Sequence, residues 1–267
     1  MKIATWNLNH RAGVGPLKRA KPIVAAISAL DADVVVLTEY VRQPRREDIL
    51  PLMSEMGWHH LSTLHTKGEN SVLIVSKSIL RKGRIVAPQV HASAPPNALH
   101  VHIPSLGLEI LGLRVPDYSK SIYRGIRATY WDWLMTVARD TVSRPFLIIG
   151  DLNTDPSYSP SKYGDRLHGM VRLGWQHALP GAGWSYKGNA TKPGGEKRLD
   201  HAFVTGHFEI RNSSYVSISG EHVFAGDKAR QLSDHAPLVV DLEPVDINLD
   251  LGYPSFQEGS NDAKTRS

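Results

Sequence analysis

The chain has 267 residues, of which 41% are hydrophobic and 21% are charged, proportions typical of one large globular domain. It contains no cysteine, which excludes disulfide bonds and thiolate metal sites, so a metal ion would need carboxylate, amide or imidazole ligands. The net charge of +5 permits a phosphate-bearing partner without requiring one, because a solvated basic surface explains the charge equally well.

The first half of the chain alternates apolar strands with short helices. Val34 to Leu37 form a continuous apolar run, typical of a strand buried on both faces, and Glu39 stands at its carboxyl end. Glycines and prolines predict irregular structure over Lys77–Asn97. The expected elements are a strand at Lys2–Leu8, a helix at Leu17–Leu30, a strand at Asp33–Tyr40, a helix at Arg45–Met56, a strand at Ser71–Ser76, and a hairpin of Leu99–Ile103 with Leu108–Val115.

The second half begins with the clearest helix, at Ser121–Asp140. Its apolar residues recur every three or four positions, which places Trp133 in the core rather than on a base-stacking surface. The other expected elements are a strand at Phe146–Ile149, a helix within Ser157–Leu173, a long loop at Pro180–Lys197, and strands at Arg198–Thr205, Ser214–Ser219 and Leu238–Leu242. We expect one domain over residues 1–243 and a tail over 244–267, largely disordered and most polar at Gly259–Ser267.

The stretch Phe146–Pro156 (FLIIGDLNTDP) is the centre of the sequence. Its buried strand ends at a carboxylate and an amide, Asp151 and Asn153, which are costly to desolvate unless they bind something. In an extended segment these two side chains would point the same way, toward a phosphate, a metal ion or an attacking water. The alternative is an Asx-turn that merely closes the strand.

Acidic or amide residues end five apolar strands in all. Hard oxygen ligands in such positions suit Mg²⁺ or Mn²⁺, and an imidazole oriented by a carboxylate could act on water. The residues are Asn7, Glu39, Asp151 with Asn153, Asp200, and Asp234 with His235.

The motifs that carry these residues resemble those of the endonuclease/exonuclease/phosphatase superfamily, the group of DNase I, exonuclease III and the AP endonucleases. They occur in family order and span nearly the whole chain: TWNLN (5–9), VVVLTE (34–39), IIGDLNTDP (148–156), RLDHAFVT (198–205) and SDHAPLVVDL (233–242). The resemblance implies an α/β fold, a four-layer sandwich in which two mixed sheets face each other and helices cover both, and the expected elements fit this architecture.

The resemblance also implies roles at matching positions. Glu39 would be the principal ligand of Mg²⁺ (or Mn²⁺), supported by Asn7 and Asp234. Asp151 would align or deprotonate the attacking water, Asn153 would hold a phosphate oxygen, and His235 paired with Asp200 would act on phosphate or water. How Asp151 and His235 divide this work is left open.

Three positions depart from the family pattern. Thr38 replaces the frequent Gln before the metal-binding Glu. Arg114-Val115-Pro116-Asp117 replaces the Tyr-x-Pro-Asn of AP endonucleases, so Arg114 could bind phosphate or could be a salt-bridged strand end. Lys197 stands where AP endonucleases often have an aromatic residue.

The glycine-rich loop carries the other expected substrate contacts, Trp184, Lys187 and Lys197, although Trp184 could simply pack. The sequence therefore predicts a metal-dependent phosphoesterase, foremost a nuclease acting on DNA or RNA. A phosphatase or phosphodiesterase for a small molecule or lipid headgroup, and a catalytically weak nucleic-acid-binding relative, are the alternatives. We expect a monomer, cytoplasmic because no membrane span or signal-peptide core is present.

Overall fold

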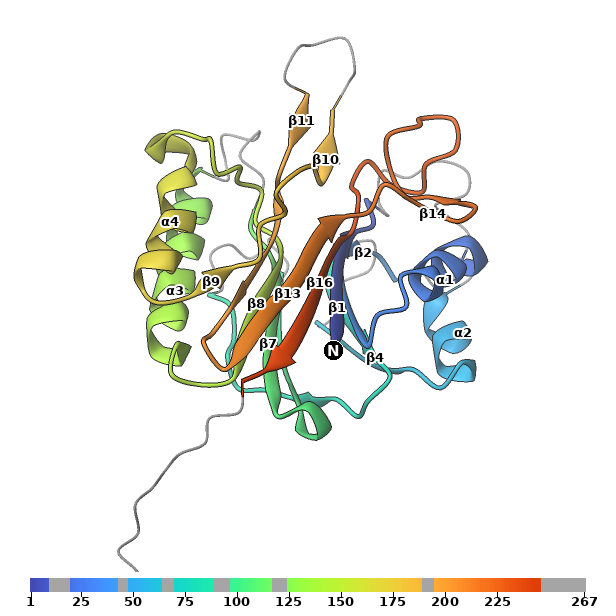
Figure 1. The fold of residues 1–267 in the computed structure, drawn as a ribbon, viewed down its shortest axis with the longest axis horizontal. Coiled ribbons are helices and arrows are strands. Elements are labelled where there is room, and N and C mark those ends of the chain that lie inside the picture. Colours follow the sequence, from blue (N-terminus) through green and yellow to red (C-terminus); the bar gives the residue numbers. More distant parts are fainter. Residues whose placement is uncertain are drawn as a thin grey trace, which may run out of the picture.

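Two six-stranded mixed sheets form the centre of the fold in the computed structural model, which describes residues 1–9, 20–42, 48–63, 70–88, 97–116, 124–188 and 195–245 (Figure 1). The first sheet has the order β13 (Phe208–Tyr215), β16 (Leu238–Pro244), β1 (Lys2–Asn7), β2 (Val34–Tyr40), β4 (Ser71–Ser76) and β3 (His59–Ser62). The second has the order β5 (Arg81–Lys82), β6 (Ala98–Ile103), β7 (Leu108–Arg114), β8 (Phe146–Asp151), β12 (Asp200–Val204) and β9 (Gln176–His177). In each sheet one central pair is parallel, β1 with β2 and β7 with β8.

Helices and short ribbons surround these sheets. The helices are α1 (Ala20–Ala29), α2 (Ile49–Glu55), α3 (Arg124–Thr141) and α4 (Gly164–Arg172), with 3₁₀ turns η2 (Pro104–Leu106) and η4 (Pro160–Lys162). The ribbons are β10 (Tyr186–Lys187) with β11 (Glu196–Lys197), and β14 (Ile218–Ser219) with β15 (His222–Val223). None of the helices in the described ranges is long and apolar enough to cross a membrane.

Three apolar cores separate four layers, which confirms the predicted α/β sandwich. The middle core lies between the sheets and contains residues of both, such as Ile3, Val36 and Ile149. One outer core packs α1 and α2 on the first sheet, and the other packs α3 and α4 on the second (Figure 1). Trp131 and Trp175 are among the buried residues of the latter. Strands such as β4 and β8 are buried on both faces because helices cover one side and the other sheet covers the opposite side.

The expected elements are present, with corrections at their ends. The strand at 146–149 continues through Gly150 to Asp151, since both residues pair with β7 and β12. The strand expected at Ser214–Ser219 is wrong, because β13 ends at Tyr215 and β14 begins at Ile218. The polar sequence of β13 reflects its place at the sheet edge, where most of its side chains are at least partly exposed.

The loop expected at Pro180–Lys197 is likewise not free of regular structure, because β10 and β11 pair within it. Trp133 is only partly buried in the outer core, and Trp131 is the fully buried tryptophan of α3. The beginnings of three expected helices, at 17–19, 45–47 and 121–123, lie outside the described residues, as does the tail from 246 onward.

Candidate active site

Asn7 and Glu39 meet because β1 and β2 are parallel neighbours. Asn7 is paired in register with Thr38, so the carboxyl ends of the two strands lie side by side. Glu39 adopts a left-handed conformation with φ 53°, and the register of β2 with β4 shifts between Leu37 and Tyr40. This irregularity turns the Glu39 carboxylate toward Asn7, whose Nδ2 donates to Oε1 at 3.2 Å.

The second sheet supplies three more charged residues in one row. Asp151 at the end of β8 is paired in register with Arg114 on β7 and with Asp200 on β12. Gly150 permits this close pairing, because its φ is 149° and a Cβ there would lie 1.9 Å from the carbonyl oxygen of Leu113. Asp151 is 1% exposed and Asp200 is fully buried.

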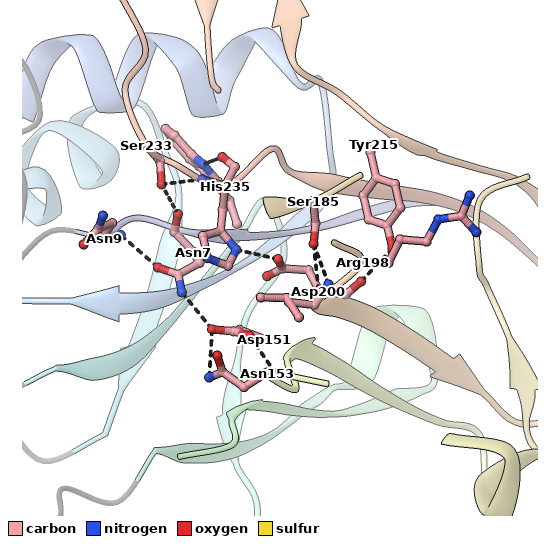
Figure 2. Close-up of polar contacts among 12 residues, drawn as sticks. Asn7, Asn9, Asp151, Asn153, Ser185, Arg198, Asp200, Tyr215, Ser233 and His235 are labelled. Carbon is pink, nitrogen blue, oxygen red and sulfur yellow. Dashed lines mark hydrogen bonds and ion pairs between the residues drawn. The ribbon is translucent and has the colours of Figure 1, made fainter. Parts of the chain in front are cut away.

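A hydrogen bond joins the two sheets at this point. The Nδ2 of Asn7 donates to Oδ2 of Asp151 at 2.8 Å, as Figure 2 shows. Arg114 strengthens the same junction, with its guanidinium 2.8 Å from Glu39 Oε1 and its Nε 3.6 Å from Asp151 Oδ2. Residues from β1, β2, β7 and β8 therefore form one polar cluster, in which Arg114 is a salt-bridged strand-end arginine that also reaches the centre of the site.

Asn153 lies beside Asp151 for a different reason from the one that the sequence suggested. The segment is not extended, because Asn153 has φ 50° and lies beyond the end of β8. Its backbone N–H donates to Asp151 Oδ1 at 2.9 Å, which is an Asx-turn, and its Nδ2 donates to the Val115 carbonyl at 2.7 Å. The Asx-turn and the polar site are thus the same structure rather than alternatives.

His235 forms a buried pair with Asp200. Its Nδ1 lies 2.7 Å from Asp200 Oδ2 (Figure 2), and the backbone around it is fixed by Ser233, whose Oγ accepts from the His235 N–H and donates to the Asn7 carbonyl. Trp6 Nε1 donates to the His235 carbonyl at 2.9 Å. Asp200 is held by Ser185, whose Oγ accepts its N–H at 3.0 Å.

A cavity of about 540 Å³ opens over these groups. It is lined by Asn9, Glu39, Arg114, Arg127, Asp151, Asn153, Tyr158, Lys162, Tyr186, Leu199, Asp234 and His235. Six of the residues expected from the sequence therefore share its wall, and Asn7 and Asp200 support it from behind through their hydrogen bonds to Asp151 and His235.

The loop residues expected to bind substrate are not in this wall. Lys187 pairs with Glu196 at 3.0 Å and lies 5.4 Å from the Trp184 ring, which in turn packs near Gly226. Trp184 therefore lies among these neighbours, half-buried, and its role in binding substrate stays a prediction. Lys197 is outside the wall as well, but its ammonium lies 5.4 Å from the ring of Tyr158, which does line the cavity.

The sequence reasoning missed several lining residues, above all Arg127 on α3. Its guanidinium is buried, with NH2 donating to the Thr154 hydroxyl at 2.6 Å and to the Asn153 carbonyl. Arg127 precedes Tyr130 and Trp131 by three and four residues, so helical periodicity put it on the buried face, where a charge signals a specific partner. Tyr158, Lys162 and Tyr186 gave no comparable signal.

The surroundings of Asp151 and His235 raise the pKa values of both groups. Burial raises the pKa of Asp151 to about 7, and the negative charge of Asp200 acts in the same direction against the opposing effect of His235 and Arg114. Burial alone would lower the pKa of His235, but the charge and hydrogen bond of Asp200 outweigh it and raise the value to about 10. The site therefore contains a carboxyl group that can exchange a proton near neutral pH beside an imidazolium.

The fit of a divalent cation depends on the carboxylate oxygens that remain. Within the described ranges, no three His, Cys, Asp or Glu side chains converge to hold a metal ion by themselves. However, Asp234 Oδ1 is buried without a hydrogen-bond partner. Within the described residues, the contacts of Glu39 with Asn7 and Arg114 both use Oε1, which leaves Oε2 available as a ligand. Mg²⁺ commonly takes one or two carboxylates and completes its shell with water and phosphate, so this donor set fits such an ion.

Comparison with known proteins places the chain in a family and a fold. A sequence model described as the Endonuclease/Exonuclease/phosphatase family matches residues 4–235. No curated protein matches the chain.

Solved structures show the same fold at low sequence identity. A 3′-5′ exonuclease (NExo) from Neisseria meningitidis aligns with TM-score 0.67 and 19% identity over 91% of this chain and 100% of its own. An AP endonuclease from Archaeoglobus fulgidus aligns with TM-score 0.71 and 17% identity over 91% and 99%. The 3′ phosphatase NExo from Neisseria, bound to product DNA hairpin, aligns with TM-score 0.68 and 18% identity over 91% and 99%. With a family match over most of its length and this DNase I-like fold, the chain belongs to the Endonuclease/Exonuclease/phosphatase family.

Proposed function

We propose that the protein is a divalent-metal-dependent phosphoesterase that hydrolyses phosphodiester bonds in nucleic acid. The observation that carries the proposal is the convergence of both sheets on one cavity, where Asn7 joins Asp151 at 2.8 Å and His235 joins Asp200 at 2.7 Å. A hydrolase needs a water-activating group, a phosphate-binding cation and a rigid support for both; in this proposal Asp151 is the first, Glu39 and Asp234 would hold the second, and the hydrogen bonds between the sheets provide the third.

Glu39, with Asp234 and Asn7, would hold the cation. Glu39 lines the cavity, and its printed contacts with Asn7 and Arg114 use Oε1, so Oε2 could bind the ion. Asp234 would contribute its unpartnered Oδ1. When bound, Mg²⁺ or Mn²⁺ would neutralise phosphate charge and stabilise the charge that develops during phosphoryl transfer.

Asp151 would act as the base and His235 as the phosphate ligand. A carboxyl group with a pKa of about 7 can accept a proton from water and release it again near neutral pH. The protonated His235, held by Asp200 through Nδ1, keeps Nε2–H as a donor for a phosphate oxygen. Asn9 and Asn153 in the cavity wall could provide further polar contacts to phosphate.

Nucleic acid is the favoured substrate class for two reasons. The cavity wall includes Arg114, Arg127 and Lys162, whose charges suit a polyanion. The similar solved structures carry the printed names exonuclease, AP endonuclease and 3′ phosphatase, the last bound to DNA. A small phosphorylated molecule is the second candidate, because the cavity is large enough to enclose one.

The first test measures turnover of bis-p-nitrophenyl phosphate, plasmid, single-stranded and abasic DNA, RNA and phosphorylated small molecules, each with Mg²⁺ and with Mn²⁺. We expect metal-dependent hydrolysis of nucleic acid that EDTA abolishes. Turnover of small phosphomonoesters alone would favour the second candidate, and no turnover of any ester would contradict the proposal.

A Glu39→Gln substitution tests the metal anchor. It keeps the side-chain volume and removes the charge that holds the cation, so kcat/KM should fall by roughly a thousandfold or more while the melting temperature stays near that of the wild type. Excess Mn²⁺ could restore part of the activity. Wild-type turnover at limiting Mg²⁺ would show that Glu39 does not anchor the ion.

A further inference from the structure

A second group of cations lies beside the proposed catalytic residues. Tyr158 and Lys162 follow the Asn153 turn in the chain, and both line the cavity. The ammonium groups of Lys162 and of Lys197 each lie 5.4 Å from the centre of the Tyr158 ring. The two ammonium groups are therefore separated by at most twice that distance, although their residues come from η4 and from β11.

No carboxylate of the residues that the structure describes lies at salt-bridge distance from Lys162 or Lys197. By contrast, Lys187 on the neighbouring strand pairs with Glu196 and Arg166 pairs with Asp132. Asp155 is one acid near Lys197: burial acts to raise its pKa, but hydrogen bonds from Arg198 and Ser157, together with the charge of Lys197, lower it.

Both carboxylate oxygens of Asp155 nevertheless already accept hydrogen bonds. Its Oδ1 accepts from the N–H and hydroxyl of Ser157, and its Oδ2 accepts from the N–H of Arg198 at 2.8 Å. These bonds fix the turn that carries Tyr158, so Asp155 supports the surface on which the lysines converge. The positive charge of Lys162 and Lys197 thus remains available for an external anion.

We propose that Lys162, Lys197 and the ring of Tyr158 form a second phosphate-binding subsite, which holds a backbone phosphate next to the scissile one in a polynucleotide. The inference rests on the proposed function, because it takes the scissile phosphate to lie at Asp151 and His235. The two ammonium groups supply non-directional charge for a phosphate, and the Tyr158 ring, which both contact, holds them near each other.

The arrangement favours a polynucleotide over a compact monoester. The part of the cavity around Glu39 and Asp151 mixes carboxylates with cations, so its negative charge opposes a phosphate, whereas the Lys162–Lys197 group adds positive charge alone. A substrate that uses both parts must carry at least two anionic groups joined by a linker, which is the repeating structure of a nucleic-acid strand.

The test compares charge-matched single variants. K162A and K197A each remove one cation beside Tyr158, and K187A removes one cation from β10 that is paired with Glu196 and lies outside the cavity wall. The affinity of each for a fluorescein-labelled single-stranded DNA 12-mer is measured by anisotropy in EDTA, over a series of salt concentrations. Turnover of the same 12-mer and of bis-p-nitrophenyl phosphate, which has no second phosphate, is measured with Mg²⁺.

We expect K162A and K197A each to weaken DNA binding several-fold and to reduce the slope of log Kd against log salt by about 0.7, the value for one lost contact to a single strand. K187A should lose markedly less DNA affinity. In kcat/KM, the loss for the 12-mer should exceed the loss for the small diester by roughly an order of magnitude in the double variant K162A/K197A.

If K187A loses as much DNA affinity as K162A and K197A, the loss reflects the overall positive charge of the protein, and the proposed subsite is overturned. Equal losses for the 12-mer and the small diester would overturn it as well. A wild-type protein that hydrolyses neither ester would instead refute the proposed function, so the two failures can be told apart.

Discussion

The pair of Asp200 and His235 gives the most demanding prediction. Asp200→Asn keeps the shape of the side chain and removes the charge that Nδ1 of His235 contacts at 2.7 Å. A pKa rise from 6.5 to about 10 corresponds to an interaction on the order of 5 kcal/mol, and breaking a buried pair by changing one partner typically costs about 3–5 kcal/mol. Burial would then favour neutral imidazole, so the proposed phosphate ligand would lose its charge at pH 7.

We expect D200N and H235A each to lower kcat by roughly 10²–10³, the usual cost of removing one preorganised donor to a transition-state oxygen. Because the two residues act as one unit, the double variant should lose only a few-fold more than H235A alone. The assay is kcat with saturating Mg²⁺ for all three variants, together with urea unfolding at pH 7.

Tyr215→Phe is the matched control. The Tyr215 hydroxyl donates to the backbone carbonyl of Asp200 at 3.0 Å, so Y215F disturbs the same residue by about 1 kcal/mol without changing its charge. It should keep kcat within a few-fold of the wild type. Multiplicative losses in D200N/H235A, or a loss in Y215F as large as in D200N, would show that Asp200 acts only by placing its strand.

Two further predictions concern other charged groups. Arg114→Gln removes the guanidinium 2.8 Å from Glu39 Oε1. This positive charge would repel a cation bound at Glu39, and unit charges about 5 Å apart interact by roughly 3 kcal/mol at a protein surface. Calorimetry should therefore show Mn²⁺ binding to this variant at least tenfold more tightly, and weaker binding would mean that Arg114 helps to hold the ion. His177 and His201 form a buried hydrogen-bonded pair whose pKa values are both lowered, chiefly by burial, to about 2 for His177. Below pH 6.5 the histidines of the unfolded chain take up protons while the buried pair stays neutral, so the free energy of unfolding falls, by at most roughly 2 kcal/mol for each histidine at pH 5. His177→Gln should remove part of this fall, measured by urea unfolding at pH 7 and at pH 5.

The sequence alone predicted the architecture and six of the residues that line the cavity. Continuous apolar runs such as Val34–Leu37 and Phe146–Ile149 signal strands buried on both faces, because only a covered sheet removes such runs from water. The residues at the ends of these strands could be singled out because a buried polar group requires a partner. The full extent of the edge strand β13 could not be predicted, because exposed residues at a sheet edge need no apolar pattern.

Only the tertiary structure decided how these residues meet. Asn7 and Asp151 are 144 residues apart in the chain and lie on different sheets, so only the packing of the sheets could place them in hydrogen-bond contact. The left-handed turn at Asn153, which brings its N–H to Asp151, is a local geometry that the spacing of the two residues does not specify.

The cations of the cavity were decided in the same way. Lys187 and Lys197 look equivalent in the sequence, but the pairing of β10 with β11 places Lys187 against Glu196 and Lys197 near Tyr158. Which carboxylate a lysine pairs with depends on their positions in the fold, and the periodicity within one strand or helix does not specify the position of another. The sequence therefore determined which chemistry the protein can contain, and the packing of its two sheets decided which charges face the cavity.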